Sequence, residues 1–267
     1  MKGKRVELLV IDPQFDFCDP NGSLFVGGAD EDMVRLAKFV EANGRSLYDI
    51  HITLDTHHFV DIAHPIFWID SNANHPDPFT IITFDDVRDG KWKVTNPQFH
   101  NRALGYVHTL TDNGRYPLCI WPPHCLIGTP GHNVVESLRV ALAKWEEDFA
   151  MVDYVTKGSN FWTEHYSAVQ ADVPDPEDPG TMLNTRLIET LEDSDIILIA
   201  GEALSHCVAN TIRDIANNFG EDNIKKFYLL EDCSSNVTGF DQMGIDFVGE
   251  MVNRGMNLTT TTKFRFV

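Results

Sequence analysis

Residues 6–14 read VELLVIDPQ, and this stretch decides the fold. The first six residues are nearly all apolar, and the run stops at Asp12 and Pro13. A short strand that is apolar throughout is typical of a parallel sheet covered by helices on both faces, because an exposed antiparallel strand would alternate apolar and polar residues. We therefore predict a buried parallel strand over residues 6–11.

Runs of the same kind return along the chain and alternate with amphipathic stretches. The predicted strands cover residues 6–11, 50–54, 149–155, 196–200 and 227–230. The predicted helices cover residues 32–42, 134–145, 182–191, 207–218 and 240–253. This alternation predicts an α/β fold, a doubly wound three-layer α/β/α sandwich with a mostly parallel sheet.

The chain of 267 residues, 43% of them hydrophobic, fits one large domain over residues 1–267. Two stretches interrupt the pattern. Residues 58–117 are rich in Asp, Asn, Pro and aromatics, and we predict an insertion that covers the site as a lid. Residues 168–182, AVQADVPDPEDPGTM, carry three prolines among carboxylates, which predicts a solvated loop without helix.

Charge and cysteine content limit the partners. A net charge of −19 would repel phosphate backbones and anionic lipids, so nucleic acid and membrane are not expected as partners. Five cysteines, an odd number in a large chain, predict the reducing cytoplasm. The beginning, MKGKRVELLVIDPQ, has too short an apolar run for a signal peptide, and no stretch is long enough to span a bilayer.

Three predicted strands are followed by residues with reactive side chains, namely Asp12, Lys157 and Cys207. Each alone would be ordinary, as a loop aspartate, a surface lysine and a small buried thiol. Because ligands of open parallel sheets bind beyond the carboxyl ends of the strands, the three together predict a catalytic site at that edge.

The three groups have complementary roles. Cys207 begins a predicted helix, whose dipole should lower the thiol pKa, and Lys157 should lower it further. Asp12 would take the thiol proton and return it to a departing amine. We predict that Cys207 is the nucleophile, while the remaining cysteines, Cys18, Cys119, Cys125 and Cys233, are structural thiols.

A second set of residues suits a divalent metal. Asp55 and His57 lie two positions apart at a strand end, so both face one way, whereas His58 points elsewhere. His64 and His124 follow later in the chain. The competing interpretation is a structural zinc site formed by Cys119, His124 and Cys125, although their spacing is not that of paired zinc cysteines. Ligands of this kind accept zinc, manganese or iron.

The motifs IDPQFDFC, DTH, WPPHCLIGTPGH, KGSN and GEALSHCVANT occur in the order found in isochorismatase-like cysteine hydrolases. Within that family the chain most resembles the nicotinamidases, from residue 6 to about residue 230. The resemblance implies a catalytic triad of Asp12, Lys157 and Cys207. It also implies one divalent metal ion on Asp55, His57 and His124, with His64 as an additional ligand. Zinc is the leading candidate, with manganese and iron as alternatives.

The same resemblance implies further details of the pocket. The backbone N–H groups of Ala203 and Cys207 would form an oxyanion hole, next to a cis peptide between Glu202 and Ala203. Phe17 and Trp121 would hold the substrate ring between them. The chain departs from the family pattern at Thr56, where an aromatic residue is usual, and at Ser205, so the ring pocket is expected to differ.

The implied function is hydrolysis of a small amide, with nicotinamide as the leading substrate, through a thioester on Cys207. Two alternatives stay open: a related amidohydrolase that acts on carbamoyl or ureido compounds, and a non-catalytic metal-binding protein of the same fold. A homo-oligomer is expected.

Overall fold

The computed structural model describes residues 4–113 and 116–266. Its central sheet has six strands in the order β10-β9-β8-β1-β2-β7, and every neighbouring pair is parallel. The strands are β1 (Val6–Ile11), β2 (Asp49–Asp55), β7 (Asp153–Lys157), β8 (Ile196–Gly201), β9 (Phe227–Leu230) and β10 (Asn257–Thr259). All six residues of β1 and of β8 are buried, as the apolar runs predicted.

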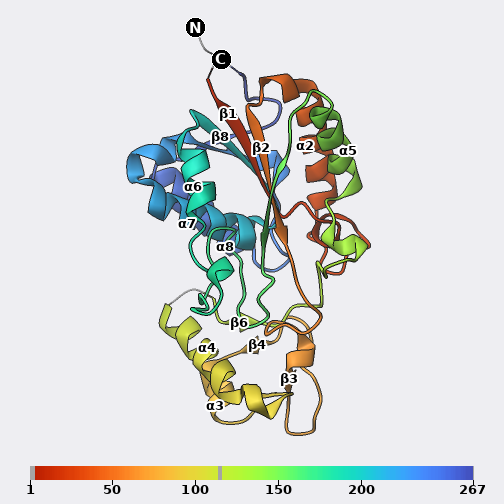
Figure 1. The fold of residues 1–267 in the computed structure, drawn as a ribbon, viewed down its shortest axis with the longest axis vertical. Helices are drawn as coiled ribbons and strands as arrows, with labels where there is room; N and C mark the ends of the chain where they lie inside the picture. The colour runs from red at the N-terminus through yellow and green to blue at the C-terminus, as the bar shows by residue number, and fades with distance from the viewer. Residues whose placement is uncertain (1–3, 114–115, 267) are drawn as a thin grey trace.

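Helices cover both faces of this sheet (Figure 1). One layer contains α2 (Ala29–Asn43) and α5 (Glu136–Glu146), which pack against each other, and the other contains α6 (Thr185–Glu192), α7 (Ala209–Phe219) and α8 (Asp241–Asn253). The predicted doubly wound three-layer α/β/α sandwich is therefore confirmed.

Two strand predictions need correction. The strand predicted over 149–155 begins only at Asp153, because Phe149 adopts a positive φ of 63° in the turn after α5 and its side chain is fully exposed. This strand ends at Lys157 itself. Strand β10 was not predicted, since it has only three residues and none of them is fully buried.

The helix predicted to begin at Cys207 begins later. Residues Leu204–Val208 form a π-helical turn, η6, and α7 starts at Ala209. Cys207 therefore lies inside the turn that leads from β8 into α7. The other short helices are α1 (Phe15–Cys18), η1 (Gly44–Ser46), η2 (Pro65–Phe67), η3 (Pro97–Phe99), η4 (Pro130–His132), η5 (Pro179–Thr181), η7 (Glu221–Lys226) and η8 (Glu231–Cys233).

Most of residues 58–117 lies at the end of the molecule opposite the chain termini (Figure 1). Two small antiparallel pairs occur here, β3 (Trp68–Ile69) with β5 (Lys93–Val94) and β4 (Ile81–Ile82) with β6 (Leu118–Cys119), together with α3 (Phe84–Arg88) and α4 (His100–Asn113). Aromatic contacts order the segment: Phe67 stacks on Phe99, and both rings contact Trp162. Residues 114–115 lie outside the described part. That this segment is a separate insertion and a lid stays a prediction.

The loop over residues 168–182 contains no α-helix among its described residues, as its prolines predicted, and has only the short turn η5. Its description as solvated is wrong for the first part, because Ala168, Val169 and Ala171 are buried. Farther along, Asp175 accepts hydrogen bonds from Arg102 on α4 and from Asn160. The loop is thus attached to the body of the protein.

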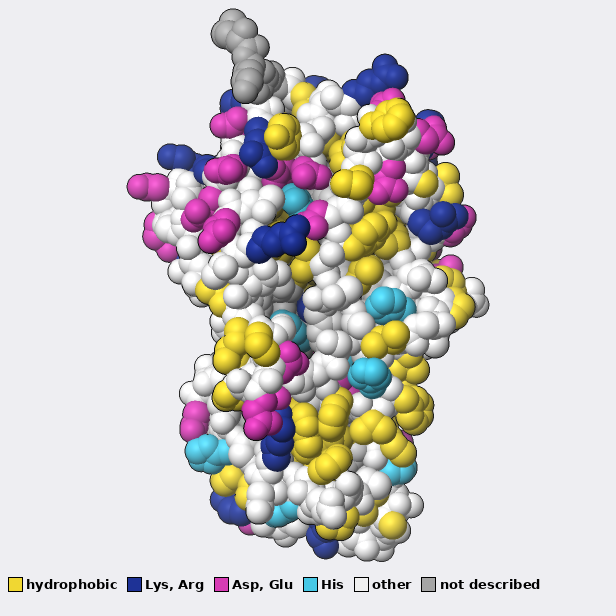
Figure 2. All heavy atoms as spheres, in the orientation of Figure 1, with side chains coloured by type: hydrophobic (Ala, Val, Ile, Leu, Met, Phe, Trp, Pro, Cys, Tyr) yellow, Lys and Arg dark blue, Asp and Glu magenta, His cyan; other side chains and the backbone are white. Residues whose placement is uncertain are grey.

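No helix among the described residues is long and apolar enough to cross a membrane. On the face shown in Figure 2, basic side chains are scattered among acidic ones. All five cysteines are free and buried, which agrees with the prediction that the chain has no disulfide framework.

One buried ionic group lies inside the sheet, away from the residues predicted to be functional. His51 on β2 is 1% exposed, and its Nε2 and Nδ1 lie 3.2 Å from Glu7 and 3.0 Å from Asp153. Burial would lower the His51 pKa, but the two carboxylates outweigh it and raise the pKa above 6.5. Burial acts to raise the Glu7 pKa, but His51 and Arg5 lower it below 4.5.

We predict that this pair stabilises the fold most between pH 4.5 and 6.5, the ordinary pKa values of its members. A raised histidine pKa gives stability that is lost as the pH rises through it, and a lowered glutamate pKa gives stability that is lost as the pH falls through it. His51→Leu should cost about 3 kcal/mol inside that window and less outside it. Urea unfolding across the pH range measures the difference. Parallel stability curves for the wild type and the variant would contradict the prediction.

Candidate active site and metal centre

The three predicted catalytic side chains meet beyond the carboxyl ends of β1, β7 and β8. Nζ of Lys157 lies 2.9 Å from Oδ2 of Asp12 and 3.7 Å from Sγ of Cys207. It also lies 3.0 Å from Oδ1 of Asp55, at the end of β2. One ammonium group therefore contacts both the predicted catalytic residues and the predicted metal centre.

Backbone and side-chain hydrogen bonds fix the Asp12 carboxylate. Asp12 follows β1 with a positive φ of 44°, its N–H donates to Oγ1 of Thr53, and that hydroxyl donates to Oδ1 of Asp12 at 2.5 Å. The next strand, β8, approaches β1 so closely that a Cβ on Gly201 would collide with the Ile11 backbone, and Gly201 has a φ of 112°. Only glycine fits this position without strain.

Burial and neighbouring charges together decide the ionisation of the triad. It raises the pKa of the Asp12 carboxyl, with Lys157 acting against it, which makes Asp12 a stronger base than an ordinary aspartate. Burial acts to lower the Lys157 pKa, but Asp12 and Asp55 outweigh it and keep the ammonium charged. Burial also raises the Cys207 pKa well above its ordinary value, despite Lys157. The expected lowering of the thiol pKa is therefore wrong, and Cys207 is held as a neutral thiol beside a base.

The predicted metal ligands also come together. One ligand atom from each of Asp55, His57 and His124 lies within 4.8 Å of the others. Nε2 of His57 lies 3.0 Å, and Nε2 of His124 3.5 Å, from Oδ2 of Asp55. The ring of His64 lies 5.3 Å from the His57 ring and 5.6 Å from the His124 ring.

The hydrogen bonds of the three histidines suit a cation. Nδ1 of His57 faces Asp61 at 3.1 Å, Nδ1 of His124 faces the Pro122 carbonyl at 2.8 Å, and Nδ1 of His64 faces the Phe59 carbonyl at 3.2 Å. An acceptor at Nδ1 favours the tautomer with the proton on Nδ1, which leaves the lone pair of Nε2 in each ring free to bind a metal. Nε2 of His64 is buried and has no hydrogen-bond partner among the described residues, so the residues present fit a divalent ion.

The competing structural zinc site is not supported. Within residues 4–113 and 116–266, the groups close enough to share an ion are Asp55 with His57 and His124, and His57 with Asp61 and Glu164. Cys119 and Cys125 belong to neither group, and burial raises the pKa of both thiols. His124 thus lies with Asp55 rather than with the cysteines.

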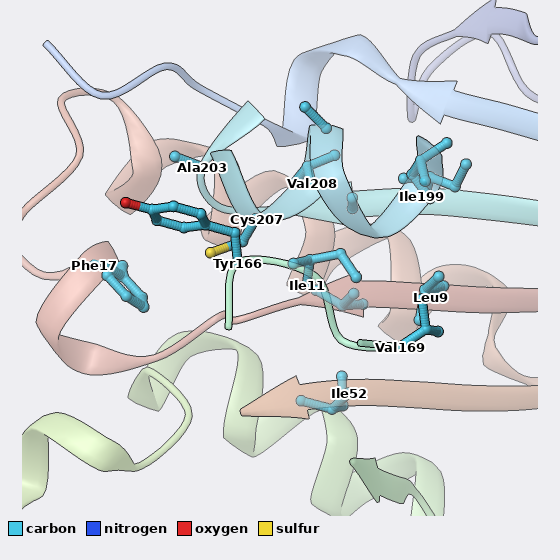
Figure 3. Packing of buried hydrophobic residues seen from close by; sticks show 14 of the residues in the cluster. Leu9, Ile11, Phe17, Ile52, Tyr166, Val169, Ile199, Ala203, Cys207 and Val208 are labelled. Carbon is cyan, nitrogen blue, oxygen red and sulfur yellow. The ribbon is translucent and has the colours of Figure 1, made fainter. Parts of the chain in front are cut away.

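A narrow pocket opens onto Cys207 and the metal ligands. It has about 30 Å³ of free volume, room for about two water molecules, so a ring-sized amide needs lining side chains to move. In Figure 3 the Cys207 sulfur lies on the same side as Ala203 and the rings of Phe17 and Tyr166. The lining residues are Phe17, Leu24, Val26, Asp55, Trp121, His124, Glu164, Tyr166, Ala203, His206, Cys207 and Val237.

Phe17 and Trp121 both line this pocket, as the resemblance implied. None of the lining residues comes from 58–117, although Phe79 packs edge-on against Trp121 with ring centroids 5.6 Å apart. Residues 58–117 therefore contact the pocket wall through Phe79, and they place the His64 ring beside those of His57 and His124.

Sequence analysis missed several lining residues, above all Glu164, Tyr166 and His206. Burial raises the pKa of Glu164 to about 8 and lowers that of His206 to about 4. At neutral pH both side chains are therefore mostly uncharged. Both residues lie near the predicted functional groups. Glu164 is close enough to His57 to share a metal ion with it, and His206 directly precedes Cys207. A glutamate within the aromatic stretch FWTEHY was the available signal, because an acid among large apolar residues is seldom exposed.

The loop before Cys207 has the cis peptide bond that the resemblance implied. The peptide bond between Glu202 and Ala203 is cis. In the described part of the chain, we find no hydrogen-bond partner for the Ala203 N–H, while the Ala203 carbonyl accepts from the N–H groups of His206 and Val208. The Ala203 N–H is thus a free donor beside Cys207.

Comparisons with known proteins agree with this geometry, although no family model matches the chain. The chain is 26% identical to the nicotinamidase of Saccharomyces cerevisiae over 208 residues, which is 76% of this chain and 78% of the relative. The solved structure of the yeast nicotinamidase matches 95% of this chain and 99% of its own, with a TM-score of 0.66 and 20% identity.

Two other solved structures have the same fold. A nicotinamidase and pyrazinamidase of Acinetobacter baumanii matches 98% of this chain and 99% of its own, with a TM-score of 0.64 and 19% identity. The pyrazinamidase of Pyrococcus horikoshii, solved in complex with zinc, matches 96% and 99%, with a TM-score of 0.56 and 19% identity. The chain therefore has the fold of the nicotinamidases and pyrazinamidases and resembles a nicotinamidase in sequence, as its motifs indicated.

Proposed function

We propose that the protein is a metal-dependent cysteine amidohydrolase that converts a small amide, with nicotinamide as the leading substrate, into the acid and ammonia. The observation that carries the proposal is Lys157, whose buried ammonium joins Asp12, Cys207 and Asp55 within 3.7 Å or less. The sequence similarity to a nicotinamidase supports the same conclusion.

The first half of the reaction follows from the triad. Sγ of Cys207 attacks the amide carbonyl carbon while its proton passes to the Asp12 carboxylate. The carbonyl oxygen becomes an oxyanion that the N–H groups of Ala203 and Cys207 stabilise. Asp12 then returns the proton to the amide nitrogen and the C–N bond breaks. Ammonia departs, and the acyl group stays on Cys207 as a thioester.

The second half reverses these roles. Asp12 takes a proton from water, the resulting hydroxide attacks the thioester carbonyl, and the C–S bond breaks. The proton returns to Sγ, so the acid leaves and the thiol is restored. Lys157 stays charged throughout and keeps Asp12 facing Cys207.

The metal would be held by Asp55, His57 and His124, with His64 as a further ligand. When bound, such an ion supplies a Lewis acid that orients the substrate or polarises a bound water. Zinc is proposed first, in line with the zinc complex of the Pyrococcus horikoshii pyrazinamidase. The burial of all four side chains gives the ion a dry surrounding.

Further parts of the proposal rest on sequence alone. We propose a cytoplasmic protein that forms homo-oligomers and binds neither nucleic acid nor membrane, built as one domain with an insertion at about 58–117. Phe17 and Trp121 are proposed to hold the substrate ring between them.

Replacing the nucleophile tests the triad. We predict that Cys207→Ala lowers kcat on the best amide by more than about 1,000-fold, because no other group can form the thioester. Cys233→Ala is the matched control, since this thiol is also buried but lies outside the pocket. Release of ammonia from nicotinamide, pyrazinamide and a ureido compound measures turnover and separates the amide substrates. Substantial turnover by Cys207→Ala would show the thioester mechanism to be wrong.

Metal content tests the second centre. We expect one divalent ion per chain in the wild type and a large loss of metal in His124→Ala, because only two of the three close ligands, Asp55 and His57, remain. His58→Ala is the control, because this neighbouring histidine is exposed and should leave occupancy unchanged. Elemental analysis of purified proteins by mass spectrometry decides the matter. Full occupancy in His124→Ala would rule out the ligand assignment.

A further inference from the structure

The loop that presents the Ala203 N–H is fixed from two sides. On one side, the Glu202 N–H donates to the Ile11 carbonyl at 2.8 Å. On the other side, Oγ of Ser234 donates to the Gly201 carbonyl at 2.7 Å, and the Leu204 N–H donates to the Ser235 carbonyl at 2.8 Å. The position of this oxyanion donor therefore depends on how residues 234–235 are held.

Two buried acids meet at Ser235. Glu202 is 0% exposed, and its Oε2 accepts the Ser235 N–H at 2.9 Å. Asp32 on α2 is 3% exposed, and its Oδ2 accepts the Ser235 hydroxyl at 2.5 Å. Glu202 does not line the pocket, so its side chain extends behind the loop rather than toward the substrate.

Ser235 brings these two acids together. Glu202 accepts a hydrogen bond from its N–H and Asp32 accepts one from its hydroxyl, and two ionised carboxylates this close would repel each other, which favours protonation of one of them. Oε1 of Glu202 is buried, and no donor reaches it from the described residues. Asp32, in contrast, already accepts from the guanidinium of Arg35 and from the Ser235 hydroxyl, both at 2.5 Å. Since Oε1 of Glu202 has no donor among the described residues whereas Asp32 has two, the proton is placed on Glu202.

The surroundings of the two acids also favour a proton on Glu202. Burial, followed by the charge of Asp32, raises the pKa of Glu202 well above its ordinary value, while the Ser235 N–H and Arg35 act against it. The other titratable groups near Glu202 are the thiols of Cys18 on α1 and Cys233 on η8, and burial keeps both of them neutral.

We propose that Glu202 is a positioning residue: as a neutral carboxylic acid it joins the oxyanion loop to Asp32 on α2 and so fixes the Ala203 N–H. It touches neither the substrate nor the reacting atoms. Its effect on catalysis rests on the proposed function, whereas the shared proton and the placement of the loop do not.

Two substitutions separate this role from plain packing. Glu202→Gln keeps an acceptor for the Ser235 N–H and gains N–H donors for Asp32, so we expect kcat within about threefold of the wild type. Glu202→Leu has a similar size but neither group, and a displaced oxyanion donor should lower kcat roughly 100-fold. KM should change little, because substrate contacts stay. Equal losses in both variants, or an active Leu variant, would overturn the positioning role.

Two further measurements do not depend on amide turnover. The infrared difference spectrum between the wild type and Glu202→Gln at neutral pH should contain the carbonyl stretch of one protonated, buried carboxylic acid, while the band of Glu164, present in both proteins, cancels. Alkylation of Cys207 by iodoacetamide should proceed at the wild-type rate in Glu202→Gln and at a changed rate in Glu202→Leu. Absence of the infrared band would overturn the neutral acid even if the enzyme is active. With the band and the altered alkylation rate present, lack of amide turnover would count against the proposed function alone.

Discussion

The site depends on one ion group, the Lys157 ammonium between the carboxylates of Asp12 and Asp55. Each of these three residues comes from the end of a different strand, and all three side chains are buried. An unpaired charge at such a position would cost several kcal/mol. The three strand ends are therefore fixed relative to one another, and Cys207 and the histidines are arranged around them.

This shared cation links two kinds of chemistry. Asp12 faces the thiol, whereas Asp55 faces the histidines, and Lys157 contacts both acids. Lys157 is thus the one side chain that contacts both groups among the described residues of the triad and the proposed metal centre. In the proposed mechanism, the raised pKa values of Cys207 and Asp12 favour a thiol that is deprotonated as it attacks over a stored thiolate.

Support for the site extends well behind the groups that would touch substrate. Gln14 accepts the Asp55 N–H and donates to the Asp55 carbonyl, both at 2.7 Å, so the end of β2 is held by the loop that follows β1. Glu202 and Ser235 hold the loop before Cys207 in a comparable way. Parallel sheets allow this arrangement because their strand ends and the following loops gather at one edge.

Sequence by itself determined much of this protein. Apolar strands such as residues 6–11 and 196–200 predicted the parallel sheet, since burial on both faces leaves no room for alternation. Asp12, Lys157 and Cys207 were identifiable because they follow such strands, and Asp55, His57 and His124 because their side chains suit a metal. Motif order added the nicotinamidase resemblance, which the comparisons support.

Tertiary structure alone decided the rest, because burial and long-range contacts are not written in local patterns. The raised pKa of Cys207 follows from desolvation, which the helix-dipole argument ignored. The π-helical turn before α7 and the three-residue strand β10 are too short to leave a periodic signal. Glu164 and Glu202 look like ordinary acids in the sequence, and only their complete enclosure by distant segments makes them neutral groups in and behind the pocket.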